Sequence, residues 1–74
     1  MNISVLLLRL RLIHIGWAQD QRELLEQGMR LQAACTWDDR LRGACTRFQL
    51  AHGRRGRRAS GIPDEETWLL LWKP

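Results

Sequence analysis

The sequence predicts an all-α fold of four helices, one of them at about residues 20–34. Apolar residues recur at helical spacing through most of the chain, between residues that suit helix starts and stops. No stretch requires a strand, since period-two alternation is confined to residues 8–12. With 74 residues, the chain is expected to form a single small domain over residues 1–74.

The clearest predicted element is a helix over residues 40–53. Its apolar stripe follows the spacing i, i+3, i+4 and i+7 and consists of Leu41, Ala44, Cys45 and Phe48. A carboxylate at Asp38 or Asp39 can accept hydrogen bonds from the free N–H groups of the first turn. Gly53 stands where a helix most easily turns left-handed and ends. The apolar face of this helix is therefore expected to be scaffold.

Residues 3–17 are predicted to form the first helix, with apolar stripes on two nearly opposite faces. One stripe holds Val5, Leu8, Leu12 and Ile15, and the other holds Leu6, Leu10, Ile13 and Trp17. Arg9 separates the stripes on one side, and Gly16 is a suitable end. A helix that is apolar on two faces is expected to lie between two neighbours or at a subunit contact.

Two further helices are predicted. Over residues 20–34, Asp20 and Glu23 form a plausible capping box, while Gly28 weakens the middle by about 1 kcal/mol. In the last helix Asp64 can cap the first turn, and residues 68–72 are apolar in every direction. Part of that last helix is therefore expected to contact the added helix or a partner.

The first nineteen residues do not fit a targeting or membrane-spanning segment. Met1 and Asn2 provide no basic start, and Arg9 and Arg11 interrupt the apolar run. We therefore expect no membrane insertion and cytoplasmic synthesis, with later incorporation into a phage particle or a wall-associated assembly left open.

Charge and cysteine content restrict the classes of function. Eleven Arg and one Lys give a net charge of +4, which is compatible with anionic partners. Cys35 and Cys45 are expected to be free thiols, because a pair separated by much of a helix rarely comes within disulfide distance. With two cysteines and two distant histidines, the sequence predicts neither a metal site nor a cofactor.

The sequence offers no catalytic constellation. His14 and His52 fall on different predicted helices, and neither cysteine has an evident base beside it. The acidic clusters at residues 38–39 and 64–66 stand where helix starts favour negative charge. The chain is therefore predicted not to be an enzyme.

The most distinctive charged segment is the predicted exposed loop of residues 54–61, which contains Arg54, Arg55, Arg57 and Arg58. These guanidinium groups could bind phosphates or carboxylates in bidentate fashion, or they could simply be solvated. Arg42 and Arg47 extend the positive charge onto the central helix.

Several short motifs follow one another in order from residue 5 to residue 71. They are Val5, Leu8, Leu12, Ile15, Gly16 and Trp17, then Trp37, then Ala44, Cys45, Phe48 and Gln49 followed by Leu50-Ala51-His52-Gly53, and finally Ser60-Gly61-Ile62, Thr67, Trp68 and Leu71. Their order and spacing resemble the peptidoglycan-binding-like domain family. The resemblance implies a three-helix peptidoglycan-binding-domain-like bundle, to which residues 18–34 add a helix, and it implies binding to the bacterial cell wall.

The chain also departs from that family's pattern. Replacements of family residues occur at Ala34, Cys35, Asp38, Leu41, Ser60 and Asp64. Since one fold carries many functions, wall binding enters only by analogy.

Three functions remain open. The first is a non-catalytic module that binds peptidoglycan or another anionic wall polymer, with Trp37 stacking on the ligand and Arg42, Arg47, Arg54, Arg55, Arg57 and Arg58 as contacts. The second is a structural or protein-interaction component of a larger assembly such as a phage particle, with partners at the first helix and at the helix of Trp68 and Trp72. The third and least favoured is nucleic-acid binding, because the sequence shows no recognisable reading element.

Overall fold

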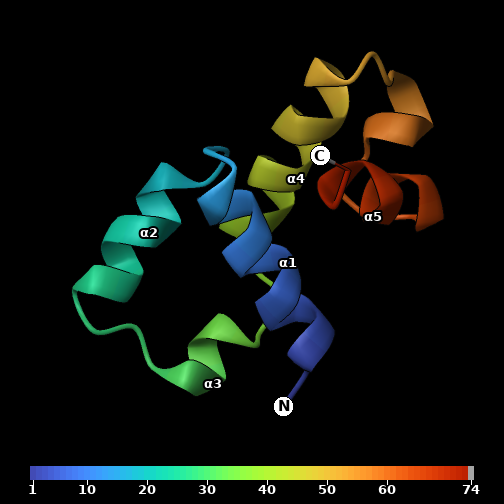
Figure 1. The fold of residues 1–74 in the computed structure, drawn as a ribbon. Helices are drawn as coiled ribbons and strands as arrows, with labels where there is room; N and C mark the ends of the chain where they lie inside the picture. Colours follow the sequence, from blue (N-terminus) through green and yellow to red (C-terminus); the bar gives the residue numbers. More distant parts are fainter. Residues whose placement is uncertain (74) are drawn as a thin grey trace.

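The computed structural model describes residues 1–73, and this part of the chain is helical with no strand. The helices are α1 (Ile3–His14), α2 (Gln19–Glu26), α3 (Leu31–Ala34), α4 (Asp39–Ala51) and α5 (Glu65–Leu71), with a 3-10 turn η1 at Gly56–Ala59 (Figure 1). The predicted all-α class is thus confirmed. None of these helices combines the length and hydropathy needed to cross a bilayer.

The core lies where α1 and α4 meet. Its fully buried apolar side chains are Leu8, Leu12, Ala18, Leu41, Ala44, Cys45, Phe48 and Leu71. The predicted stripe of α4 is therefore confirmed as its buried face. Asp38 is the N-cap of α4, with a side-chain oxygen 2.8 Å from the Leu41 nitrogen, and α4 ends before Gly53 as predicted.

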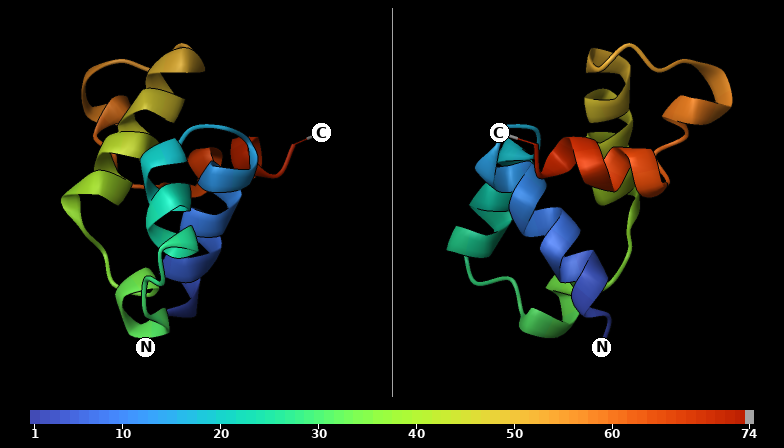
Figure 2. Two further views of the ribbon diagram at one scale, coloured as in Figure 1. Left: turned by 90° about the vertical axis from the view of Figure 1, so that its left-hand side faces the viewer. Right: turned by 45° about the vertical axis from the view of Figure 1, so that its right-hand side comes forward.

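α1 buries one of its two apolar stripes and leaves part of the other in solvent. Leu8 and Leu12 are fully buried, whereas Leu10 is 43% exposed. α2 and α3 lie on one side of α1 and α5 on the other, as the two views of Figure 2 show. The expectation that α1 lies between neighbours is therefore met at its sides, while its outer face stays uncovered.

The predicted single helix over residues 20–34 is wrong. Its place is taken by α2 and α3, which are separated at Gly28, whose φ of +100° suits glycine and ends α2. The predicted capping box is also wrong. Ala18 is the N-cap of α2 and makes no side-chain cap, while Asp20 lies within the first turn.

Arg9 is completely buried, although the sequence suggested a polar residue between two apolar stripes. Its Nε donates to the carbonyl of Ala34 at 3.0 Å, and one terminal nitrogen donates to Oε1 of the buried Gln21. The other terminal nitrogen donates to the carbonyl of Thr36 at 2.7 Å and to Asp38 Oδ2 at 3.2 Å. One guanidinium therefore joins α1 to α2, to the end of α3 and to the start of α4. A buried charge is tolerated when hydrogen bonds satisfy it in this way.

The predicted exposed loop of residues 54–61 is only partly exposed. Arg54 and Ala59 are buried, and η1 packs beside the C-terminal half of α4 (Figure 2). Gly61, with φ +86°, lies so close to α4 that a Cβ there would be 2.7 Å from the Arg42 carbonyl oxygen. The backbone of this loop is therefore fixed against α4 by contacts that only glycine allows at residue 61.

Candidate functional site

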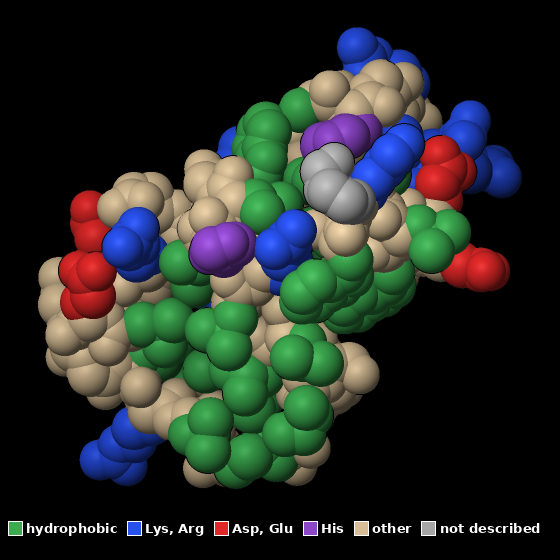
Figure 3. All heavy atoms as spheres, viewed as in Figure 1, with side chains coloured by type: hydrophobic (Ala, Val, Ile, Leu, Met, Phe, Trp, Pro, Cys, Tyr) green, Lys and Arg blue, Asp and Glu red, His purple; other side chains and the backbone are tan. Residues whose placement is uncertain are grey.

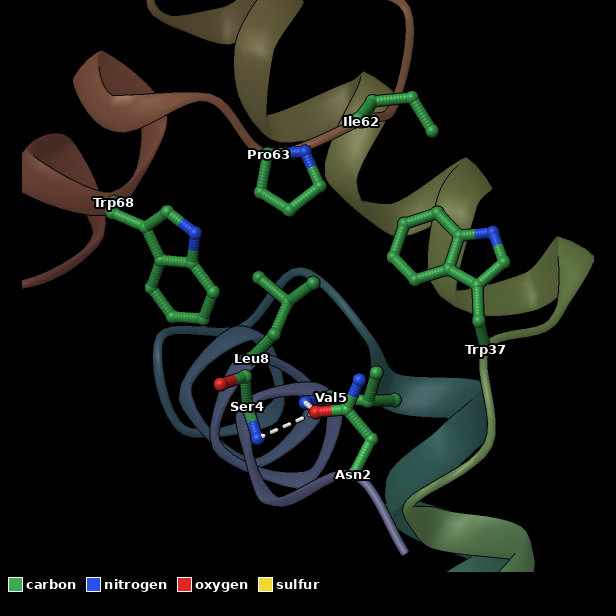
Figure 4. A pocket seen from close by; sticks show the side chains of 8 residues that line it. All are labelled: Asn2, Ser4, Val5, Leu8, Trp37, Ile62, Pro63 and Trp68. Carbon is green, nitrogen blue, oxygen red and sulfur yellow. Dashed lines mark hydrogen bonds between the residues drawn. The ribbon is translucent and has the colours of Figure 1, made fainter.

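An apolar groove of about 380 Å³ opens between the start of α1, the turn before α4 and the start of α5 (Figure 4). Its lining consists of Asn2, Ser4, Val5, Leu8, Trp37, Ile62, Pro63 and Trp68. A concave site that is mainly apolar, with a few polar groups at its edge, is the usual form of a small-ligand pocket.

Two half-buried tryptophans form opposite walls of the groove. Trp37 comes from the turn before α4 and Trp68 from α5, with Leu8 and Pro63 between them (Figure 4). Both indole N–H groups are accessible to solvent. If either were buried, it would be a buried nitrogen without a hydrogen-bond partner, and within residues 1–73 the only such side-chain atom is Arg54 Nε. The nitrogen of Trp68 is turned towards the groove, which offers a hydrogen-bond donor to a ligand (Figure 4).

The polar groups of the groove lie at the start of α1. Asn2 is the N-cap of α1, and its Oδ1 accepts from the nitrogens of Ser4 at 3.0 Å and Val5 at 3.3 Å. The amide nitrogen of Asn2 and the hydroxyl of Ser4 remain at the exposed rim. The groove therefore offers donors at this edge and at the Trp68 N–H, and apolar surface elsewhere.

Arg9 fixes the wall that carries Trp37. It donates to the Thr36 carbonyl and to the Asp38 carboxylate, so the residues on both sides of Trp37 are held by one buried group. No sequence pattern signals this arrangement, because two of the acceptors of Arg9 are main-chain carbonyls.

Gln49 fixes the opposite side of the groove. Its Oε1 accepts from the nitrogen of Gly61 at 2.8 Å, and its Nε2 donates to the carbonyl of Ile62 and to Thr67 Oγ1, both at 3.0 Å. Gln49 is buried on α4, so it anchors both the Ile62–Pro63 wall and α5 to the centre of the molecule. The Phe48-Gln49 and Thr67-Trp68 motifs are thereby joined through one hydrogen bond.

Arg54 is part of the same network, which corrects its predicted role as a ligand contact. It is 5% exposed, it binds both carboxylate oxygens of Asp64, and it donates to Thr67 Oγ1 at 3.0 Å. Asp64 is also the N-cap of α5, because its Oδ1 accepts from the Thr67 nitrogen at 2.9 Å. The hydrogen bond from Arg54, followed by those from Thr67, holds the pKa of the Asp64 carboxyl well below its ordinary 3.8. Arg54 therefore holds α5 in place and is not available to a ligand.

The other predicted arginine contacts are dispersed. Arg42 donates through Nε to the carbonyl of Ser60 at 3.0 Å, close to the Ile62 wall. Arg47 donates to the carbonyl of Trp17 at 3.3 Å, towards a different part of the molecule.

The arginines of the loop also differ from one another. Arg55 donates to two main-chain carbonyls, and Arg58 pairs with Glu66 at 3.1 Å. Arg57 is exposed and has no hydrogen bond or ion pair within residues 1–73. Of the predicted ligand contacts, only Trp37 lines the groove. Trp68, which is not among the predicted ligand contacts, also lines the groove, and it packs against the core as well.

The chemistry of the described residues provides no reactive group at the groove. No three His, Cys, Asp or Glu side chains within residues 1–73 come together as metal ligands. Both cysteines are free and buried, and burial raises the pKa of the Cys45 thiol to about 11. Such a thiol is a poor nucleophile at neutral pH.

No protein-family model, no curated protein and no solved structure matches the chain. The resemblance to the peptidoglycan-binding-like family therefore depends on the order and spacing of its motifs alone.

Proposed function

We propose that the chain is a non-catalytic binding module whose ligand lies between Trp37 and Trp68. The observation that supports this proposal is the pair of indole rings on opposite walls of one apolar groove. Both rings belong to segments that buried polar groups hold in place, Arg9 for Trp37 and Gln49 with Arg54 for Trp68. Preorganisation of this kind favours binding, because little freedom is lost when a ligand enters.

The ligand that fits best is a sugar of the bacterial cell wall. The apolar face of a pyranose ring can stack on an indole, and the methyl of an N-acetyl group can contact the apolar floor. The Trp68 N–H and the polar rim at Asn2 and Ser4 are suited to its oxygens. The resemblance to the peptidoglycan-binding-like family supports the same ligand class. The binding site proposed here is the groove and not the arginines that the sequence suggested.

Retention on insoluble peptidoglycan tests the proposal. Trp37→Ala should weaken retention about tenfold, since a central aromatic contact contributes strongly to binding. Trp72→Ala is the matched control, because Trp72 is 51% exposed and lies outside the groove. Retention equal to that of an unrelated basic protein of the same charge, or equal losses in both variants, would contradict the proposal.

A second candidate is a structural or protein-interaction role in a larger assembly. The exposed apolar side chains on α1 and α5 favour it, because surfaces of this kind often become interfaces. Light scattering of the purified chain distinguishes this role, since a clean monomer at high concentration speaks against self-assembly. Nucleic-acid binding is supported only by net charge and predicts retention on DNA that falls steeply with salt.

A further inference from the structure

The outer face of α1 and the end of α5 expose a group of apolar side chains away from the groove. Ile3, Leu7 and Leu10 follow the spacing i, i+4 and i+7 on α1 and are 56%, 46% and 43% exposed. Trp72 follows α5 and is 51% exposed. Figure 3 shows hydrophobic side chains gathered over α1 and continuing towards α5. We call Ile3, Leu7, Leu10 and Trp72 the outer apolar face.

The ionisable side chains around the outer apolar face are basic. No Asp or Glu occurs in residues 1–19 or in residues 67–73, whereas these segments contain Arg11, His14 and Lys73. The acidic side chains visible in Figure 3 lie at the left and right margins of that view. The face therefore combines apolar surface with a rim of one sign.

Arg11 and Trp72 join the two helices into one surface. Arg11 Nε donates to the carbonyl of Leu71 at 2.6 Å, and its guanidinium lies 4.8 Å from the centre of the Trp72 ring. These two contacts hold the Arg11 side chain in one position, so its guanidinium lies beside the exposed indole within the outer apolar face. A cation over an aromatic ring is a favourable pairing that fixes both groups.

We propose that the outer apolar face docks on the surface of a bilayer that contains anionic lipids, with α1 lying along the plane of the headgroups. Ile3, Leu7 and Leu10 enter the boundary between headgroups and acyl chains, which is where interfacial helices bury their apolar side. Arg11 and Lys73 contact lipid phosphates, and Trp72 occupies the interfacial level that tryptophan favours. This surface is separate from the groove, so the inference goes beyond the proposed function.

Charge complementarity favours a lipid surface over a second copy of the chain. Pairing two outer apolar faces would bring Arg11 and His14 of both copies to one interface that supplies no acidic side chain of its own. An anionic bilayer supplies the missing negative charge along the whole face.

Flotation with vesicles tests the proposal. Vesicles of seven parts phosphatidylcholine to three parts phosphatidylglycerol should bind the full chain, and pure phosphatidylcholine vesicles should bind it much less. Leu10→Glu should lower the partition coefficient about tenfold or more. The substitution removes a leucine side chain that the bilayer would bury, and it adds a negative charge near anionic lipid. Leu50→Glu is the matched control, since Leu50 is also 43% exposed, lies on α4 and undergoes the same change of charge.

Circular dichroism checks that both variants stay folded, and Leu7→Glu provides an independent position on the same face. Equal losses for Leu10→Glu and Leu50→Glu would overturn the proposal, because binding would then depend on net charge alone. Failure to float with the anionic vesicles would also overturn it. So would a dimer that Leu10→Glu dissociates and Leu50→Glu does not, since the face would then be a protein interface.

Discussion

Arg9 places a positive charge at a position with no solvent exposure, and its donors are taken up by Gln21, Asp38 and two main-chain carbonyls. Removing the guanidinium leaves the side-chain oxygen of Gln21 and the Ala34 carbonyl buried without this donor. We expect Arg9→Met to lower the free energy of unfolding by about 3 kcal/mol or more, which is most of the stability of so small a domain. Urea denaturation followed by circular dichroism measures the loss.

Arg22→Met is the control for Arg9→Met. Arg22 pairs with Glu26 at 3.4 Å on the exposed side of α2, and such a surface pair contributes about 0.5 kcal/mol or less. A loss for Arg9→Met no larger than that for Arg22→Met would show that the buried network adds nothing.

The Asp64 carboxyl gives the chain a defined sensitivity to acid. Its pKa lies below the ordinary 3.8 in the folded protein because Arg54 and Thr67 stabilise the charged form. The unfolded chain therefore binds the proton first, so stability is fully present above about pH 4 and falls as the pH drops further. Urea midpoints measured between pH 6 and pH 2.5 should decline in the original chain. In Asp64→Asn, which keeps a capping residue, stability at pH 6 should be lower and the decline should be smaller; an unchanged decline would contradict this role.

The Cys45 thiol makes the stability of the chain sensitive to alkaline pH. Burial raises its pKa from 9.0 to about 11, so the unfolded chain loses the proton while the folded chain keeps it. The contribution of this thiol to stability is present below pH 9 and should be lost between pH 9 and pH 11. Cys45→Ala should show a shallower alkaline decline of the urea midpoint than the original chain; parallel declines would exclude the thiol as the cause.

At the scale of the elements, the loop approaches α4 so closely at residue 61 that adding a single methyl group there should strongly lower the free energy of unfolding. Gly61→Ala places a Cβ 2.7 Å from a main-chain oxygen of α4 in a backbone conformation with φ +86°. Gly53 has nearly the same conformation, φ +81°, but open space around it. We expect Gly53→Ala to cost about 1–2 kcal/mol for the conformation alone, and Gly61→Ala about 3 kcal/mol or more.

Thermal melts of these two variants provide the comparison. Because Gly61 connects to Gln49 and to the Ile62 wall, Gly61→Ala should also weaken any ligand binding in the groove. Equal melting temperatures for the two variants would show that the loop moves away from α4 at little cost.

The elements that sequence reasoning predicted correctly are those with local causes. The stripe from Leu41 to Phe48 occurs as predicted, and of the two predicted candidates for the cap, Asp38 and Asp39, Asp38 is the N-cap of α4. Both features depend on spacing within a few residues. The spacing of residues 20–34 predicts one helix weakened at Gly28, whereas the positive φ of Gly28 ends α2 and divides the segment. The two buried arginines were missed for a different reason. Their partners lie 10 or more residues away, and several are main-chain atoms that no side-chain pattern reveals.

At the scale of the whole molecule, the candidate groove shows the same limit. The sequence predicts Trp37 as a stacking contact of the ligand, whereas it places Trp68 on an apolar helix and predicts no ligand contact for it. The structure places both on one groove because α1, α4 and α5 meet there. That meeting depends on long-range packing, which periodicity alone does not specify.

The segment of residues 18–34 and the arginine at residue 9 also depend on each other. The segment supplies Gln21 and the Ala34 carbonyl, which occupy much of the guanidinium. Without the segment, the guanidinium of Arg9 would lie in the centre of the molecule with two of its hydrogen-bond partners missing. Excision of the segment should accordingly give a folded protein only when Arg9 is replaced by leucine in the same step.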